Sequence, residues 1–314
     1  MREADFIETL LRFVPHSASP AGPGDDAALL GARARVLTAD ALVEDTHFLR
    51  GHPPEWLGWK TLAVNLSDVN AMGSRPEAFA LTAALPRNTP REWWERFASG
   101  LGEYARLTQT RIVGGDIVRS PGPICLSITA WGECPQEPLL RRDKADIGEH
   151  MMLAGEVGSA GIGLHAWLKQ GKRDFWQGPL PTVTPTLASH LKPSPPLWAG
   201  PTALSLGARC GLDLSDGLVW DLERLARASQ VSLHVDVDRL PLCTDAAKVP
   251  IEKLLGLGED YSLLVCVPPR LTPKFENVGF VNIGRVLAGE ASVLYERDGR
   301  RIEPQPPSFE HFED

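Results

Sequence analysis

Six short acidic motifs are the feature of this chain that most restricts its fold. Each one adjoins glycine, serine or an apolar run, as is typical of a tight turn or the end of a strand. Because carboxylates repel one another, a fold that gathers them needs cations between them, and Mg²⁺ takes oxygen ligands that it usually shares with substrate phosphates. One such motif alone fits turn or helix-cap chemistry equally well, but six together favour a metal-assisted phosphate enzyme. The motifs are Gly24-Asp25-Asp26-Ala27, Thr38-Ala39-Asp40, Leu66-Ser67-Asp68, Gly114-Gly115-Asp116, Asp213-Leu214-Ser215-Asp216-Gly217 and Gly258-Glu259-Asp260-Tyr261.

Composition and charge narrow the class of protein. The 314 residues suffice for two domains of ordinary size, and 43% hydrophobic with 23% charged residues is typical of a globular chain. A net charge of −8, without a long Lys/Arg run, argues against nucleic acid as a partner. No apolar run reaches about 18 residues, so no membrane span is expected. The five cysteines are odd in number and include no Cys-x-x-Cys pair, which predicts reduced, buried thiols in a cytoplasmic protein.

Apolar periodicity predicts helices and strands that alternate irregularly along the chain. Asp40 is expected at the carboxyl end of a strand, a second strand is expected to break at Gly114, and a hairpin is expected through Arg297-Asp298-Gly299-Arg300. The pattern predicts an α/β or α+β fold with two similar-sized domains, residues 1–140 and 141–314. The expected helices cover 3–13, 54–72, 90–107 and the two sides of an acidic turn within 201–229; the expected strands cover 35–38, 77–85, 111–113, 123–132, 151–157, 231–237 and 261–267.

Familiar phosphate-binding loops are absent from the sequence. Gly22-Pro23-Gly24-Asp25-Asp26-Ala27 matches a dinucleotide-binding pattern formally, but no strand precedes it and two Asp side chains would face a bare pyrophosphate. No P-loop sequence occurs, so an ATP cleft would need another scaffold. The glycine-rich segment 155–163 could hold a phosphate at a helix N-terminus or could serve close helix packing. His47 fits a structural role. Arg142 fits either a structural role or contact with an anion between the domains.

The motifs, in this order, resemble the thiamine-monophosphate kinase family, which belongs to a larger group related to aminoimidazole ribonucleotide synthetase. The resemblance runs from about residue 3 to the C-terminus. Its most specific segments are Gly24 to Leu30, Lys60-Thr61-Leu62-Ala63-Val64-Asn65-Leu66-Ser67-Asp68 with Ala71-Met72-Gly73, Val113-Gly114-Gly115-Asp116, Asp213 to Leu218 and Gly258 to Tyr261.

The resemblance implies an ATP-dependent phosphotransferase whose N-terminal sheet domain forms a homodimer. It implies several Mg²⁺ ions held among the carboxylates, with ATP and thiamine monophosphate as the small-molecule partners. Matching positions give seven metal ligands, of which the six Asp are also the catalytic set: Asp25, Thr38, Asp40, Asp68, Asp116, Asp213 and Asp216. Matching positions also give nucleotide contacts at Gly115, Asp116, Arg142 and Ser215, and substrate contacts at His47 and Glu259.

The chain departs from the family pattern on the substrate side. Ala39, Leu257, Pro196 and Ser159 replace a Thr, a Gly, an Arg and an Asp, and Pro306 stands near the position of a substrate-stacking aromatic residue. All the catalytic acids are present. Three alternatives remain open: a sister enzyme that activates a different acyl or carbamoyl oxygen with ATP, a non-catalytic protein that binds thiamine phosphates, and an acidic calcium module, which no EF-hand spacing supports.

Overall fold

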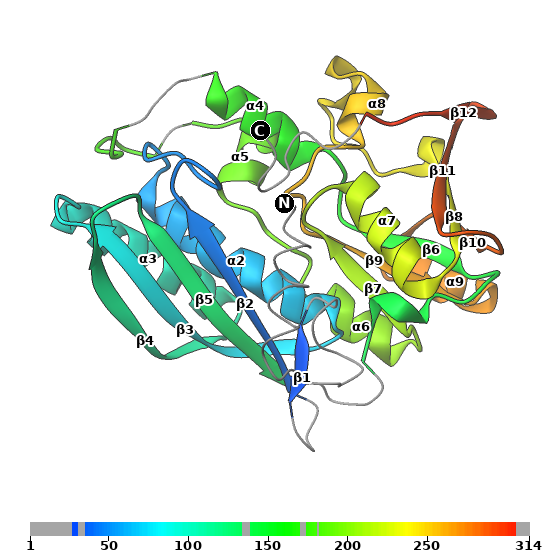
Figure 1. Ribbon diagram of the computed structural model, residues 1–314, viewed down its shortest axis with the longest axis horizontal. Helices are drawn as coiled ribbons and strands as arrows, with labels where there is room; N and C mark the ends of the chain where they lie inside the picture. Colours follow the sequence, from blue (N-terminus) through cyan, green and yellow to red (C-terminus); the bar gives the residue numbers. More distant parts are fainter. Residues whose placement is uncertain (1–26, 31–34, 134–138, 170–173, 181, 306–314) are drawn as a thin grey trace.

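The first half of the chain forms a five-stranded sheet with two helices on one face. The computed structural model describes residues 27–30, 35–133, 139–169, 174–180 and 182–305 (Figure 1). The strand order is β1-β2-β5-β3-β4, with β3 and β4 parallel and the other neighbours antiparallel. The strands are β1 (Ala28–Leu30), β2 (Arg35–Val43), β3 (Arg75–Pro86), β4 (Arg111–Ser120) and β5 (Cys125–Glu133), and the helices are α2 (Pro54–Ala71) and α3 (Arg91–Leu107).

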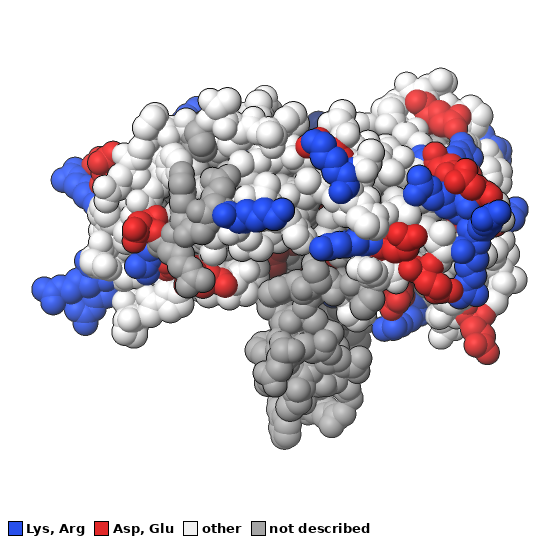
Figure 2. All heavy atoms as spheres, turned by 90° about the horizontal axis from the view of Figure 1, so that it is seen from above, with Lys and Arg blue, Asp and Glu red and all other residues white. Residues whose placement is uncertain are grey.

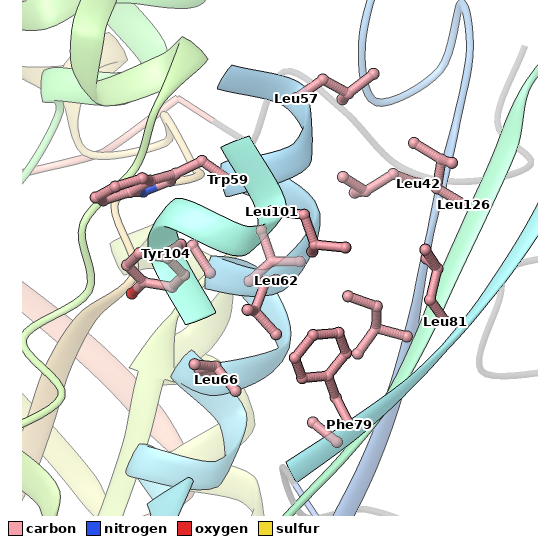
Figure 3. Close-up of a cluster of buried hydrophobic side chains, with 14 of the residues drawn as sticks. Leu42, Leu57, Trp59, Leu62, Leu66, Phe79, Leu81, Leu101, Tyr104 and Leu126 are labelled. Carbon is pink, nitrogen blue, oxygen red and sulfur yellow. The ribbon is translucent and has the colours of Figure 1, made fainter. Parts of the chain in front are cut away.

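Helices α2 and α3 differ in how much of their surface is buried. Helix α3 is amphipathic and buries mainly Trp93, Phe97, Leu101 and Tyr104, as expected of a helix with one face in water. Helix α2 is buried on nearly all sides, because it lies between the first sheet and the second half of the chain. Figure 3 shows leucine side chains of α2 facing Phe79, Leu81 and Leu126 of the sheet.

Glycine allows α2 and α3 to approach one another closely. A Cβ atom added at Gly58 of α2 would lie 2.1 Å from the carbonyl oxygen of Phe97, and one added at Gly100 of α3 would lie 1.7 Å from the carbonyl oxygen of Glu55. Neither distance is compatible with a side chain, so the two backbones touch at these glycines.

The second half of the chain is built on a seven-stranded mixed sheet, on the right in Figure 1. Its strand order is β12-β11-β8-β10-β6-β9-β7. The strands are β6 (His150–Ala154), β7 (Cys210–Leu214), β8 (Ser232–Asp236), β9 (Ser262–Val267), β10 (Val281–Leu287), β11 (Ser292–Arg297) and β12 (Arg300–Ile302). The helices are α4 (Ser159–Leu168), α5 (Pro185–Leu191), α6 (Ala199–Ser205), α7 (Leu218–Ser229), α8 (Ile251–Leu254) and α9 (Thr272–Glu276).

Polar bonds join α2 and the segments next to it to the second half of the chain. Trp59 Nε1 donates to the carbonyl of Pro193 at 2.7 Å, and Ser67 Oγ donates to Asp213 Oδ2 at 2.5 Å. Further along, the Gly200 N–H donates to Asn70 Oδ1 at 2.8 Å. These contacts are buried, where polar groups need partners, so they fix how the two sheets lie relative to α2.

Most of the expected elements are confirmed within the described residues. The helices expected at 54–72 and 90–107 are α2 and α3, and the expected terminal hairpin is the antiparallel pair β11–β12. The helix expected at 3–13 lies outside the described residues.

Four expectations about the strands are wrong. Strand β4 does not break at Gly114 but continues to Ser120, with a register irregularity opposite Phe79 and Ala80. Strand β2 extends to Val43, so Asp40 lies within it rather than at its end. A buried strand, β7, lies between the helices expected in 201–229, and strand β10 was not expected at all.

Figure 2 shows acidic and basic side chains intermixed on one face of the molecule, without a continuous basic surface there. Among the helices of the described residues, none is long and apolar enough to cross a membrane. Cys125, Cys210, Cys243 and Cys266 are free thiols; Cys210, Cys243 and Cys266 are buried and Cys125 is half-buried.

We expect Gly100→Ala to destabilise the protein, because the new methyl group must push α3 away from the Glu55 carbonyl. Overpacking of this kind costs about 1–3 kcal/mol of the free energy of unfolding. Gly102→Ala is the matched control on the same helix, since its nearest neighbour is the flexible end of Arg106 at 3.3 Å. There the helix-forming preference of Ala should add up to about 1 kcal/mol. Urea denaturation compares the two, and equal stability of the two variants would contradict the close contact.

Candidate functional site

A cleft of about 690 Å³ brings together motifs that are far apart in the sequence. One wall comes from β2 and the loop that follows it, and the opposite wall comes from α4, α5 and the acidic turns of the second half. The lining residues that the sequence singled out are Thr38, Asp40, His47, Asp68, Arg142, Ser215, Asp216 and Glu259. A cleft of this size accommodates a nucleotide-sized or cofactor-sized ligand.

The wall from the first half presents carboxylates held by helix α2. Thr38 Oγ1 on β2 donates to Asp68 Oδ2 on α2 at 2.7 Å, so the hydroxyl and the carboxylate lie side by side at the cleft. The backbone N–H of Asp40 donates to Asn65 Oδ1 of the same helix at 3.0 Å. These bonds fix strand β2 against α2, and they place two acidic side chains on one wall.

The acidic turn after β7 supplies the second group of carboxylates. Asp213 lies in β7, one residue before its end; it is almost fully buried, and it accepts the hydrogen bond from Ser67. Asp221 on α7 accepts from the backbone N–H groups of Asp216 and Gly217, both at 3.1 Å, which shapes the turn. Asp216 lies at the cleft in an ion pair with Arg224.

Two arginines place positive charge in the cleft. Arg142 lies in a short 3₁₀ turn (Arg142–Lys144) and Arg224 lies on α7, and both line the cleft. Ser229 Oγ donates to the Arg142 carbonyl at 2.7 Å, which fixes that turn against α7. The acidic residues and the arginines therefore line a common space. That space suits a polyanionic ligand that is bound together with cations.

Glu259 lies at the cleft with both of its oxygens engaged. Lys60 Nζ, on α2, donates to one oxygen at 2.6 Å, and His190 Nδ1, on α5, bonds the other at 2.6 Å. Burial acts to raise the pKa of Glu259, but the charge of Lys60 and the hydrogen bonds from Lys60 and His190 hold that pKa well below its usual range. The backbone of Glu259 has φ of 69°, a strained value of a kind that concentrates at functional sites.

His47 is held in one orientation by the backbone. The N–H of Val43 donates to His47 Nδ1 at 3.1 Å. Because that nitrogen accepts, the neutral ring carries its proton on Nε2. His47 lines the cleft and can offer that N–H to a ligand.

The glycine-rich segment does not present a phosphate cradle. Asp260 accepts from the N–H groups of Gly158 and Ala160, at 2.6 and 3.0 Å, so a carboxylate already occupies the N-terminus of α4. Burial raises the pKa of Asp260 to about 7. The glycines instead allow close packing, since a Cβ at Gly163 would lie 2.1 Å from the Thr186 carbonyl oxygen.

Three expected site residues in the described part of the chain do not line the cleft: Gly115, Asp116 and Asp213. Gly115 and Asp116 lie on β4, at the far edge of the first sheet from β2, and neither lines the cleft. Asp25 lies outside the described residues, as does Pro306. Within the described ranges, no three His, Cys, Asp or Glu side chains gather closely enough to hold one metal ion by themselves.

The sequence analysis missed Lys60, His190 and Arg224 as site residues. Lys60 carried a usable signal, because a lysine inside the apolar face of a helix requires a buried acidic partner; its side chain is fully buried. His190 lies on a helix whose position relative to the acidic turns depends on the tertiary fold, so the local sequence did not indicate it. Arg224 carried a local signal, since it lies three residues after Asp221 on the helix that follows the acidic turn.

Comparison with known proteins gives one consistent result. The model of the AIR synthase related protein, N-terminal domain, matches residues 24–134. The thiamine-monophosphate kinase of Mycobacterium tuberculosis is 34% identical over 284 residues, which cover 87% of this chain and 81% of the relative. The thiamine-monophosphate kinase of Aquifex aeolicus is 33% identical and covers 92% of both chains.

A solved structure described as AaThiL complexed with AMPPCP and TMP has the same fold. It superposes with a TM-score of 0.84 at 30% identity, and it covers 99% of this chain and 97% of its own. Identity at this level over nearly the whole length, together with the shared fold, establishes the relationship. The chain therefore belongs to the thiamine-monophosphate kinase family.

Proposed function

We propose that this chain transfers the γ-phosphoryl group of ATP to the phosphate of thiamine monophosphate, which yields thiamine diphosphate. The observation that carries the proposal is the cleft in which Asp40, Asp68 and Asp216 face Arg142 and Arg224, in a chain of this family. A solved relative contains AMPPCP and TMP, which are ligands of the kind that such a cleft suits.

The transfer needs positioning more than proton chemistry. A phosphate monoester has its second pKa near ~6, so the acceptor oxygen is already largely ionised at neutral pH and no general base is required. The task is to align two polyanions and to offset their mutual repulsion. Arg142 and Arg224 would face phosphate oxygens, and His47 would donate a hydrogen bond from Nε2.

The residues at the cleft fit magnesium. Mg²⁺ in phosphate-transfer sites is usually bound by one or two carboxylates, with substrate phosphates and water completing the shell. Asp40, Asp68 and Asp216 at the cleft, with Asp213 behind them, supply such carboxylates without forming a complete protein cage. Thr38 and Asp25 complete the ligand set that we propose. The bound ions would supply charge that stabilises the transferring phosphoryl group.

We propose that the protein is a homodimer formed through its first sheet. Strand β4 is an edge strand, and its apolar side chains Ile117 and Val118 are 59% and 45% exposed. An exposed apolar edge strand is usually covered by another chain. The sheet face opposite α2 and α3 carries small residues such as Ala39 and Thr82, which permit close approach of a second copy.

Dimerisation would also explain the position of Asp116. Strands β5 and β3 lie between β2 and β4, so at about 4.8 Å a step Asp116 lies about 14 Å across the sheet from β2. The register pairs Asp40 with Ile128, Ile128 with Leu81 and Leu81 with Gly115, so Asp116 points to the other face of the sheet. We therefore propose that Asp116 and Gly115 contribute to the nucleotide site of the partner chain.

We propose two further assignments. The chain divides into an N-terminal domain of residues 1–140 and a C-terminal domain of residues 141–314, on either side of the buried residue Leu140. The free thiols of the four described cysteines suit the cytoplasm.

Asp68→Asn tests the proposed function. The amide can still accept from Thr38, so folding should be retained, but the lost charge should lower kcat roughly 100- to 1000-fold. Thiamine diphosphate formed from Mg·ATP and thiamine monophosphate is followed as thiochrome fluorescence. Asp146→Asn is the control, because Asp146 is exposed and does not line the cleft. Full activity of Asp68→Asn would exclude this acidic site, and wild-type binding without metal-dependent product would indicate a non-catalytic binding protein.

Val118→Glu should convert the dimer to a monomer, because a charge would be buried in the interface. Light scattering after size exclusion measures the mass. The control is Val278→Glu, since Val278 is 40% exposed but lies in the second half of the chain. A wild-type monomer, or a dimer that tolerates Val118→Glu, would contradict the proposed interface.

Mixed dimers test whether Asp116 acts on the partner chain. Asp68→Asn and Asp116→Asn chains should each be inactive alone. After unfolding and refolding together, about one site in four should have both acids intact if Asp116 serves the partner. Recovery of activity to that level supports the proposal. If Asp116 served its own chain, no mixed dimer would contain an intact site and activity would stay at the level of the single variants.

A further inference from the structure

Three ring nitrogens without partners lie close together beside the cleft. They are His52 Nδ1, His190 Nε2 and Trp167 Nε1, and each is buried without a hydrogen bond in the described part of the chain. The His52 ring centroid lies 6.4 Å from that of Trp167 and 6.4 Å from that of His190. All three side chains are at least 99% buried. Buried polar groups without partners are rare in native proteins, so a cluster of three indicates a ligand.

The three residues come from separate elements that meet at one end of the cleft. Trp167 lies on α4 and His190 on α5, and both line the cleft. His52 lies in the loop before α2, where its other nitrogen bonds the Leu191 carbonyl at 2.8 Å. The fold therefore fixes each ring from behind and leaves one nitrogen of each without a protein partner.

The existing bonds determine which of the nitrogens donate and which accept. A carbonyl oxygen only accepts, so His52 carries its proton on Nε2 and its Nδ1 is an acceptor. His190 directs Nδ1 at the Glu259 carboxylate, so its Nε2 is an acceptor in the neutral ring. Burial, then the charge of Lys60, lowers the pKa of His190 and favours that neutral ring. The Trp167 indole only donates.

The two histidines each offer an acceptor nitrogen and the indole offers a donor N–H. A ligand group that bonds all three has two donor hydrogens beside one acceptor. An aromatic amine next to a ring nitrogen has this pattern on one edge, and so does the aminopyrimidine ring of a thiamine phosphate. A single water molecule also has it.

We propose that His52, Trp167 and His190 form the subsite that recognises the aminopyrimidine edge of the acceptor, an inference that rests on the proposed function. The amino group donates to the two histidines, and the ring nitrogen accepts from the indole. The Trp167 and His190 side chains already border the cleft, so the edge of the ligand would approach the three nitrogens from that side.

The subsite also connects recognition to the charge network. His190 bonds Glu259 through one nitrogen and the acceptor through the other, and Lys60 holds the remaining oxygen of Glu259. Burial and the charge of Lys60 lower the pKa of His190 and favour its neutral ring, and the bond to Glu259 fixes the tautomer. Lys60 and Glu259 act through His190 as positioning residues for the aminopyrimidine.

The test compares thiamine monophosphate with an analogue in which a carbonyl oxygen replaces the exocyclic amino group. The analogue reverses the pattern, because its oxygen accepts and its ring nitrogen donates. Wild type should favour the amine by roughly 100-fold in kcat/KM, since a buried polar site rejects a mismatched partner strongly. Trp167→Phe keeps an aromatic ring but removes the donor, so the preference should fall by about tenfold. Trp56→Phe, in the same apolar cluster but away from the cleft, should keep the wild-type preference.

Two additional measurements separate the possible outcomes. The rise in Tm that each ligand produces gives the same preference from binding alone, so it tests the subsite even if no phosphoryl transfer occurs. If no product forms but the rise in Tm still favours the amine over the carbonyl analogue, the proposed function is overturned and the subsite is supported.

Urea unfolding without ligand tests for a resident water. Trp167 is fully buried and Trp56 is half-buried, so Trp167→Phe should be the less stable variant through lost packing alone. A loss larger than that of packing would indicate that the indole N–H bonds a resident water. An unchanged ligand preference in Trp167→Phe would overturn the proposal at any stability, because the indole would then not contact the ligand.

Discussion

The burial of helix α2 on nearly all sides is the constraint on which the rest of the structure depends. A helix in this position cannot keep its polar side chains in water, and each buried polar group without a partner costs free energy. The helix carries four polar side chains into the interior, and each has a partner. Lys60 bonds Glu259 and Ser67 bonds Asp213, while Asn65 bonds strand β2 and Asn70 bonds α6. The bonds that satisfy α2 are therefore the bonds that position the acidic motifs. Folding of the core and assembly of the site are one process in this protein, because neither sheet can be placed without completing these contacts.

The ion network around Glu259 shows how the same constraint shapes the electrostatics of the cleft. A lone carboxylate in this position would repel the phosphates of both substrates. With Lys60 on one oxygen and His190 on the other, its charge is locally offset and its pKa stays low. Glu259 was expected to contact the substrate, and each of its oxygens already takes part in one hydrogen bond. These bonds orient Lys60 and His190, while Asp40, Asp68 and Asp216 line the same cleft.

The sequence predicted the helices with strong periodicity and the motifs with distinctive chemistry, because both depend on local information. Helices α2 and α3 and the cleft positions of Asp68, Ser215 and Glu259 follow from such patterns. Strand β4 was cut short because Gly114 and Gly115 usually end a strand, whereas pairing with β3 carries the backbone through them. Strand β7 was overlooked because a five-residue apolar run between helices is ambiguous without its partner β9. Lys60 and His190 could not be paired with Glu259 from the sequence, since 199 residues separate Lys60 from Glu259 and only the tertiary fold brings them together. Arg224, in contrast, lies three residues from its partner Asp221 on one helix, and that pair could have been predicted.

The position of Asp116 fits a contact with a second chain, as proposed above. Its motif is as distinctive as the others, yet it lies on an edge strand whose apolar side chains are exposed and whose register turns the carboxylate away from β2. An acidic residue on an exposed apolar edge opposes self-association unless something positive meets it there. The Mg²⁺ ions that we propose at the cleft of a second copy would provide that positive partner. Placing the carboxylate and the apolar strand on one surface would then make dimer formation and completion of the site depend on the same contact, just as α2 couples the two sheets within the chain.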